Sequence, residues 1–196
     1  MMKFADRIRT LTCLLVPLTI SLIFMACESP TEPAESYIEV VSVAEVQPEC
    51  EVVETQYYDI PLSHELQDYL RECCEARDIP VALALAFIDV ESDFRPELIS
   101  STNDYGLMQI NIGNHDYITE QIGVTDYLAP MDNINAGTYW LSRYYPRYDI
   151  EQAAICYNRG EGKAKQFFKQ GIYSTDYSKE IMKEYERYKD VISSNN

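Results

Sequence analysis

The sequence predicts an all-α fold, and three observations lead to this class. Between residues 63 and 192 apolar side chains recur at helical spacing, and no run alternates apolar and polar residues as a half-buried strand does. The stretch IPVALALAFIDVES, residues 79–92, is apolar on nearly every side, so we expect a helix that is packed on all its faces. A chain of 196 residues with 46% hydrophobic content has room for one good core. We therefore expect one helical domain with additional segments.

Capping residues divide this helical part into segments. Ser63 is a suitable N-cap for a helix through HELQDYLRECCEARD, and Asp78 followed by Pro80 marks the start of the next helix. Loops at about 100–106 and 158–162 are expected to form the walls of a cleft, while Trp140 and Leu141 are assigned to the core. The remaining predicted helices are MDNINAGTYWLSRYYPRY, DIEQAAICYN, EGKAKQFFKQG and STDYSKEIMKEYERYKDVI.

The N-terminus has the parts of an export signal. Three basic residues precede the apolar stretch LTCLLVPLTISLIFMAC, which ends in small residues and is followed by a polar segment. FMAC resembles a bacterial lipobox, which predicts residues 1–27 as a lipoprotein signal, Cys27 as the lipidated residue, and an extracytoplasmic location at a membrane or in the cell wall. An uncleaved membrane helix is the alternative, but Pro17 and the short span disfavour it.

Residues 28–61 are rich in Glu, Pro and Ser and contain no Lys, Arg or His. Their acids have no basic partner nearby, which is typical of a disordered, solvated tether. Fully extended, such a segment reaches on the order of 100 Å. The sequence thus predicts a signal over 1–27, an acidic linker over 28–61 and a folded domain over 62–192.

Charge and composition exclude several kinds of partner. A net charge of −16 argues against nucleic acid, because phosphate binding depends on clustered Lys and Arg. No CxxC motif is present and the only histidines are His64 and His115, so we expect no metal and no cofactor.

The cysteines allow more than one interpretation. Outside the cytoplasm a disulfide from Cys73 or Cys74 to Cys50 or Cys156 is possible, and the sequence does not choose the partner. Cys156 also fits the pattern of a small buried hydrophobic residue.

Glu91 is an acid at the end of the apolar helix that otherwise predicts core. Burial and the negative end of the helix dipole both disfavour its ionised form, so its pKa should be raised. A carboxyl group that stays protonated near neutral pH can donate a proton to a glycosidic oxygen. The alternative is an ordinary acid at a helix end, exposed or paired with Arg95.

Three motifs give this acid a context. ESDFRPELIS, GLMQIN and, about fifty residues on, CYNRGEG resemble, in this order, the motifs of the lytic transglycosylase family, whose SLT domain has a goose-type lysozyme-like fold. The resemblance covers roughly residues 66–190. Two places depart from it: TND at 102–104 stands where many members have Thr, Gly and Ala, and CYNRGEG replaces a form with Ala before Tyr and with Ala and Pro among the glycines.

The resemblance implies a role for each motif residue. Glu91 would be the catalytic acid and base, and the other implied residues contact the sugar chain or close the cleft: Ser100, Met108, Gln109, Tyr157, Asn158 and Tyr177. Other interpretations remain open. Ser100 is also a plain turn residue, Met108 and Tyr157 also fit a core, and Asn158 also fits a helix stop.

The implied reaction is cleavage of the β-1,4 bond between N-acetylmuramic acid and N-acetylglucosamine without water, which forms 1,6-anhydromuramic acid on peptidoglycan glycan strands. A hydrolytic muramidase is the alternative. An inverting hydrolase needs a second carboxylate about 6.5–9.5 Å from the first, and Asp104, thirteen residues after Glu91, is the candidate. Asp104 also fits a turn-capping role. A wall-binding lipoprotein scaffold with little turnover is a further alternative.

Overall fold

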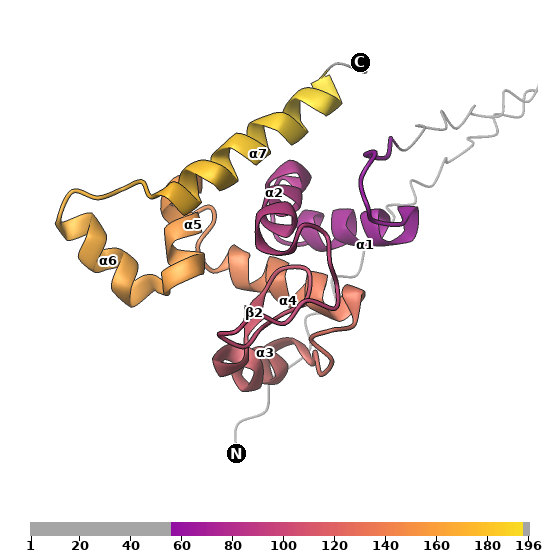
Figure 1. Cartoon of the computed structure of the whole chain (residues 1–196), viewed down its shortest axis with the longest axis horizontal. Coiled ribbons are helices and arrows are strands. Elements are labelled where there is room, and N and C mark those ends of the chain that lie inside the picture. The colour runs from indigo at the N-terminus through magenta and orange to yellow at the C-terminus, as the bar shows by residue number, and fades with distance from the viewer. Residues whose placement is uncertain (1–55, 194–196) are drawn as a thin grey trace, which may run out of the picture. The chain divides into compact units, whose positions relative to one another are not determined.

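The computed structural model describes residues 56–193, and this part of the chain is mostly helical (Figure 1). The predicted signal and residues 28–55 of the predicted linker lie outside it. The described elements are helices α1 (His64–Glu75), α2 (Val81–Ser92), α3 (His115–Ile122), α4 (Pro130–Ser142), α5 (Ile150–Arg159), α6 (Glu161–Lys169) and α7 (Asp176–Ser193), strands β1 (Asp104–Tyr105) and β2 (Ile110–Asn111), and a short 3-10 helix, η1 (Ile112–Asn114).

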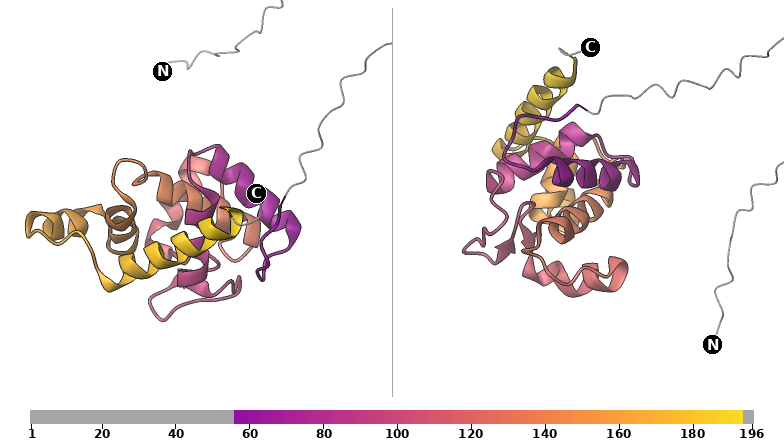
Figure 2. Two further views of the ribbon diagram at one scale, coloured as in Figure 1. Left: turned by 90° about the horizontal axis from the view of Figure 1, so that it is seen from above. Right: turned by 90° about the vertical axis from the view of Figure 1, so that its right-hand side faces the viewer.

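Helix α2 lies at the centre of the core. Its residues from Ala82 to Ile88 are all buried, which confirms the prediction of a helix packed on every side. Helix α7 makes the most extensive contacts with α2 and also packs on α5 (Figure 1 and Figure 2). Burying such a continuous apolar run stabilises the fold at roughly 25 cal/mol per Å² of apolar surface removed from water.

Some predicted helix ends are correct and others are wrong. Ser63 caps α1, accepting a hydrogen bond from the Leu66 N–H at 3.2 Å. Helix α4 ends at Ser142, six residues before the predicted end at Tyr148. Pro146 explains the early end, because proline has no N–H to donate and disfavours a helical conformation of the residue before it.

A small antiparallel hairpin, β1 and β2, is an addition to the predicted all-α fold. The buried Asn133 of α4 holds its loop: its Oδ1 accepts from the Met108 N–H at 2.7 Å, and its Nδ2 donates to the Tyr105 and Tyr127 carbonyls, each at 2.8 Å. Gly106, at φ +71°, allows this approach, because a Cβ there would lie 2.4 Å from Asn133 Nδ2. The hairpin is therefore fixed to α4 at a defined distance.

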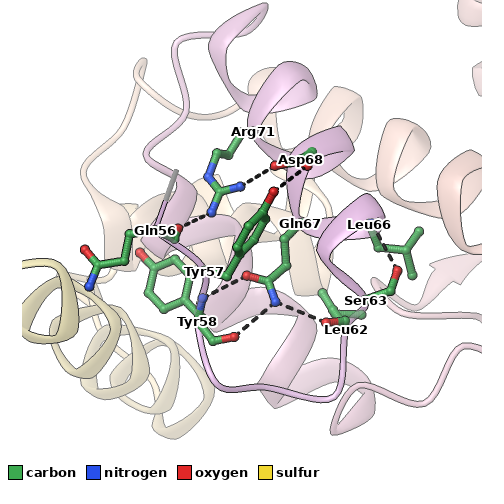
Figure 3. Close-up of polar contacts among 9 residues, drawn as sticks. All are labelled: Gln56, Tyr57, Tyr58, Leu62, Ser63, Leu66, Gln67, Asp68 and Arg71. Carbon is green, nitrogen blue, oxygen red and sulfur yellow. Dashed lines mark hydrogen bonds and ion pairs between the residues drawn. The ribbon is translucent and has the colours of Figure 1, made fainter. Parts of the chain in front are cut away.

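Residues 56–62, which we call the clasp, pack against α1 as Figure 3 shows. The buried Gln67 amide accepts from the Tyr58 N–H at 2.9 Å and donates to the Tyr58 and Leu62 carbonyls at 3.1 and 3.0 Å. Tyr58 is itself buried, and its ring meets the edge of Tyr188 of α7 at 5.7 Å. The predicted boundary at residue 62 is thus too late, because residues 56–61 are fastened to the domain.

Further contacts hold the clasp. The Tyr57 hydroxyl donates to Asp68 at 2.8 Å, and the Arg71 guanidinium donates to the Gln56 carbonyl (Figure 3). The His64 ring stacks on Tyr57 at 3.8 Å. These contacts have no sequence signature, because each depends on how the segment folds back.

The three cysteines of the described part, Cys73, Cys74 and Cys156, are buried and free. The possible bond from Cys73 or Cys74 to Cys156 is therefore not formed, and Cys50 lies outside the described residues. Burial raises the pKa of Cys74 to about 12 and that of Cys156 to about 11, so both stay as thiols. Within residues 56–193, no helix combines the length and the apolar character needed to cross a bilayer.

Candidate active site

Glu91 lies in the last turn of α2, half-buried, and its Oε1 accepts a hydrogen bond from the Tyr177 hydroxyl of α7 at 2.5 Å. Burial raises its pKa from the ordinary 4.5 to about 7, although the Tyr177 hydrogen bond opposes this shift. The negative charge of Asp104 raises the pKa further. Glu91 is therefore protonated and ionised in comparable amounts near neutral pH, as its position in the sequence predicts.

The end of α2 places Glu91 at the surface of the core. Asp93 and Phe94 both have left-handed backbone angles, φ +50° and +58°, directly after the helix. Such a conformation costs a side-chain-bearing residue roughly 1–2 kcal/mol. The buried Phe94 ring compensates for part of this cost. The chain thus turns away immediately after Glu91 and leaves its carboxyl group beside open space.

That space is a cleft of about 520 Å³. Both segments that the sequence predicts as its walls contribute to it, but the prediction of a loop at 158–162 is wrong, because α5 runs to Arg159 and α6 begins at Glu161. Five of the predicted site residues meet there, from α2, the hairpin and α5: Glu91, Asp104, Gln109, Tyr157 and Asn158.

Asp104 occupies the hairpin side of the cleft. Its Oδ2 accepts from the Ser100 hydroxyl at 2.6 Å and from the Thr102 hydroxyl, while its Oδ1 accepts from Asn111 Nδ2 at 2.8 Å. Burial alone would raise the pKa of Asp104, but these hydrogen bonds together lower it. Asp104 is therefore a fixed negative charge at neutral pH.

Gln109 and Tyr157 are held by backbone groups. Gln109 has φ +46°, and its Nε2 donates to the Gly106 carbonyl at 2.8 Å and the Leu98 carbonyl at 3.1 Å. The Tyr157 hydroxyl donates to the Met108 carbonyl at 2.8 Å. Both side chains are thus positioned before any ligand binds.

Three predicted site residues do not line the cleft. Met108 is fully buried and packs on α4, where a Cβ on Gly137 would lie 2.2 Å from its Sδ, so the structure favours the core interpretation. Ser100 acts through Asp104, as described above. Tyr177 touches Glu91 without contributing to the cleft wall.

Sequence reasoning missed several residues of the cleft. Trp140, assigned to the core, is only partly buried and lines the cleft, whereas Leu141 is fully buried as expected. The aromatic face of Trp140 is a suitable surface for a sugar ring. Four more lining residues had no predicted place in the cleft: Ile110, Asn111, Asn114 and Lys163. Thr102, Arg159 and Gly160 also line it and lie in the segments predicted as its walls.

No cluster of metal ligands accompanies these residues. Within residues 56–193, no three His, Cys, Asp or Glu side chains come close enough together to hold an ion. The titratable carboxyl groups that line the cleft are Glu91 and Asp104.

Two proteins of known function are similar in sequence. The soluble lytic murein transglycosylases of Escherichia coli K12 and O157:H7 are each 27% identical to this chain over 113 residues. The match covers 54% of this chain and 17% of theirs, so it spans about a sixth of these relatives' length.

Solved structures show the fold. The lytic transglycosylase Slt of Pseudomonas aeruginosa, solved as an inactive mutant, superposes with a TM-score of 0.59 at 21% identity, over 70% of this chain and 26% of that one. The 70 kDa soluble lytic transglycosylase of Escherichia coli gives 0.58 at 22% identity, over 68% of this chain and 25% of that one. A sequence model of the Transglycosylase SLT domain matches residues 68–181, more than half of the chain. The chain belongs to the Transglycosylase SLT domain family.

Proposed function

We propose that this protein is a peptidoglycan lytic transglycosylase that cleaves the β-1,4 bond between N-acetylmuramic acid and N-acetylglucosamine and leaves a 1,6-anhydromuramic acid end. One observation carries the proposal: Glu91 lines the cleft with a pKa of about 7. A general acid and base works best when its pKa lies near the working pH. Family membership supports the same reaction class.

A single acid can complete this reaction. Protonated Glu91 donates its proton to the glycosidic oxygen as the bond from that oxygen to C1 of the muramic acid breaks. The acetamido oxygen of the same sugar stabilises the cationic C1. Ionised Glu91 then removes the proton from the C6 hydroxyl, and O6 bonds to C1. The proton balance closes on Glu91, so no water is consumed.

Hydrolysis by a muramidase is the second candidate, because Asp104 lines the same cleft. A base that activates water needs a free lone pair and some affinity for a proton. Asp104 already accepts three hydrogen bonds, from Ser100, Thr102 and Asn111, and its pKa is lowered. These features support a structural and electrostatic role for Asp104 and favour ring closure.

Mass spectrometry of the products from purified peptidoglycan tests the proposal. We expect anhydro ends from the wild type and from Asp104→Asn, and a rate for Glu91→Gln lower by at least roughly 10²–10⁴-fold. Ends that have gained water, lost in Asp104→Asn, would identify a muramidase. Binding of strands without turnover by the wild type would identify the scaffold alternative.

We also propose that the protein is exported and anchored at a membrane through Cys27, supported by the basic residues, the apolar stretch and FMAC. Detergent partitioning of the wild type and Cys27→Ser tests this. We expect only the wild type to enter the detergent phase. Two aqueous proteins would contradict the anchor.

A further inference from the structure

The α5–α6 side of the cleft is basic. Arg159, the last residue of α5, and Lys163 of α6 both line it, on the two helices labelled at the left of Figure 1. The chain as a whole carries 32 acids and 16 basic residues, so two cations in one cleft stand out from its composition.

Neither cation is neutralised within the described part of the chain. No carboxylate among residues 56–193 pairs with Arg159 or Lys163. The Arg159 guanidinium lies 5.1 Å from the centre of the Phe167 ring, which supports it without removing its charge. Its hydrogen-bonding edges therefore remain available to a ligand.

The acid between them in sequence, Glu161, does not line the cleft. Its Oε1 accepts from the Tyr148 hydroxyl at 2.9 Å and lies 3.0 Å from Lys165 Nζ and 3.4 Å from Arg147. The hydrogen bond from Lys165, then that from Tyr148, lower the pKa of Glu161. The charge of Glu161 is thus balanced by Lys165 and Arg147. It does not weaken the attraction of Arg159 and Lys163 for an anion in the cleft.

The two sides of the cleft therefore differ in charge. Asp104 on the hairpin repels an anion, while Arg159 and Lys163 attract one. Glu91 also lines the cleft. Because its pKa is about 7, its side chain is only partly ionised at neutral pH and carries only part of a negative charge on average. An anionic group on a bound sugar chain would be placed on the α5–α6 side, where a guanidinium can bind a carboxylate with two hydrogen bonds.

We infer that Arg159 and Lys163 bind a carboxylate carried by the muramic acid, so that the enzyme selects strands by the charge of this substituent. The inference rests on the proposed function. The carboxylate has two chemical sources. In stripped strands it is the free lactyl group, and in complete strands it belongs to the stem peptide that is linked to that group.

Steady-state kinetics on four substrates distinguish these sources. They are strands with stem peptides, strands stripped by an amidase, and each of these after methyl esterification of the carboxyl groups. The variants are Arg159→Ala, Lys163→Ala and the double variant. Lys169→Ala is the matched control, because Lys169 is an exposed residue of α6 that does not line the cleft.

We expect the double variant to raise KM roughly tenfold or more on at least one unesterified substrate, with kcat nearly unchanged and a weaker dependence on salt. Esterification should raise the wild-type KM to a similar value and remove the difference between the proteins. An effect on stem-bearing strands alone identifies the peptide, and one on stripped strands alone identifies the lactyl group. An unchanged KM in the double variant, or an equal rise on esterified strands, would overturn the inference.

Binding separates this inference from the proposed function. Equilibrium binding of the same four substrates to Glu91→Gln, with and without the two substitutions, needs no turnover. Weaker binding that depends on the free carboxylate supports the two cations even if the wild type makes no anhydro product. Binding that is indifferent to esterification contradicts them even if the product is formed.

Discussion

The role proposed for Glu91 has two requirements that usually conflict. A proton donor must hold its proton at neutral pH, and the base that follows must release it. Burial raises the pKa of Glu91 to about 7, while the Tyr177 hydroxyl limits the shift. Both forms are then accessible within a small free-energy difference, which suits one residue with both tasks.

This pKa makes stability depend on pH. Folded Glu91 holds its proton more tightly than the unfolded chain does, so its contribution is complete below pH 4.5 and is lost as the pH rises to about 7. The loss is at most on the order of 3 kcal/mol. Glu91→Gln, which can still accept the Tyr177 hydrogen bond, should therefore gain Tm relative to the wild type at pH 8 but not at pH 4. Calorimetry at the two pH values measures this, and an equal difference at both would contradict the shift.

The raised pKa of Glu91 should also appear in the pH dependence of the reaction rate. If the protonated form starts the reaction, activity per molecule falls as the pH passes about 7. Asp104→Asn removes a charge that raises the pKa of Glu91, so the falling limb should move to lower pH. Asp93→Asn is the control, because Asp93 is an exposed acid near Glu91 that does not line the cleft. A limb that stays in place in Asp104→Asn would mean that the two acids are not coupled.

Single residues could be predicted where a motif and a helix end coincide. Glu91, Gln109, Tyr157 and Asn158 all line the cleft that the sequence predicts. Met108 could not be placed, because its direction depends on Gly137, which comes from another helix. A contact between residues so far apart in the chain leaves no local pattern.

At the scale of elements, the hairpin depends on one buried amide. Asn133 contributes three hydrogen bonds to the loop and its surroundings, and an apolar replacement leaves their partners unsatisfied. The hairpin carries Asp104 into the cleft. Loss of the Asn133 side chain in α4 should therefore disturb the position of Asp104 in the cleft.

We expect Asn133→Ala to lower the free energy of unfolding by about 1–3 kcal/mol for each buried group left without a partner, and to lower activity as well. Asn135→Ala is the control on the same helix. Asn135 is half-buried and its Oδ1 accepts one hydrogen bond from Arg77, so its loss should cost less and leave activity near that of the wild type. Chemical denaturation and turnover of peptidoglycan measure both effects. Equal behaviour of the two variants would contradict the role of Asn133.

Most helices could be predicted because their apolar spacing extends over several turns. The hairpin could not, since its strands have two residues each and show no alternation. Helix α3 also escaped prediction, because it is short and Ile118 is its only fully buried residue. Short elements depend on tertiary contacts, which local patterns do not contain.

At the scale of the whole described domain, the clasp joins its two ends. Tyr58 and Tyr188, whose rings meet, both lie outside residues 68–181, the part that matches the family. Tyr188 also donates to Asp89 of α2 at 2.9 Å. The contact therefore connects the start of the domain to α7 and, through α7, to the central helix.

We expect Gln67→Ala to lower the free energy of unfolding by about 1–3 kcal/mol or more, because the Tyr58 and Leu62 backbone groups lose their partners. Its kcat should stay near that of the wild type, since Gln67 does not line the cleft. The control is Gln121→Ala, at an exposed position of α3. Thermal melts and turnover test the pair. A loss of kcat at unchanged Tm would show that the clasp serves catalysis.

The clasp also determines which contacts of the domain first resist a force applied to the chain before Gln56. A pull on the chain before Gln56 meets the clasp first, and the hydrogen bonds from the clasp to helices end on Gln67, Asp68 and Arg71, all of α1. Glu91 and the hairpin lie on other elements, and the clasp reaches α2 only indirectly, through the packing of the Tyr58 ring on Tyr188 of α7. If the predicted linker is placed under tension, the hydrogen bonds on α1 would therefore be loaded before those that hold Asp104 and Gln109 in the cleft.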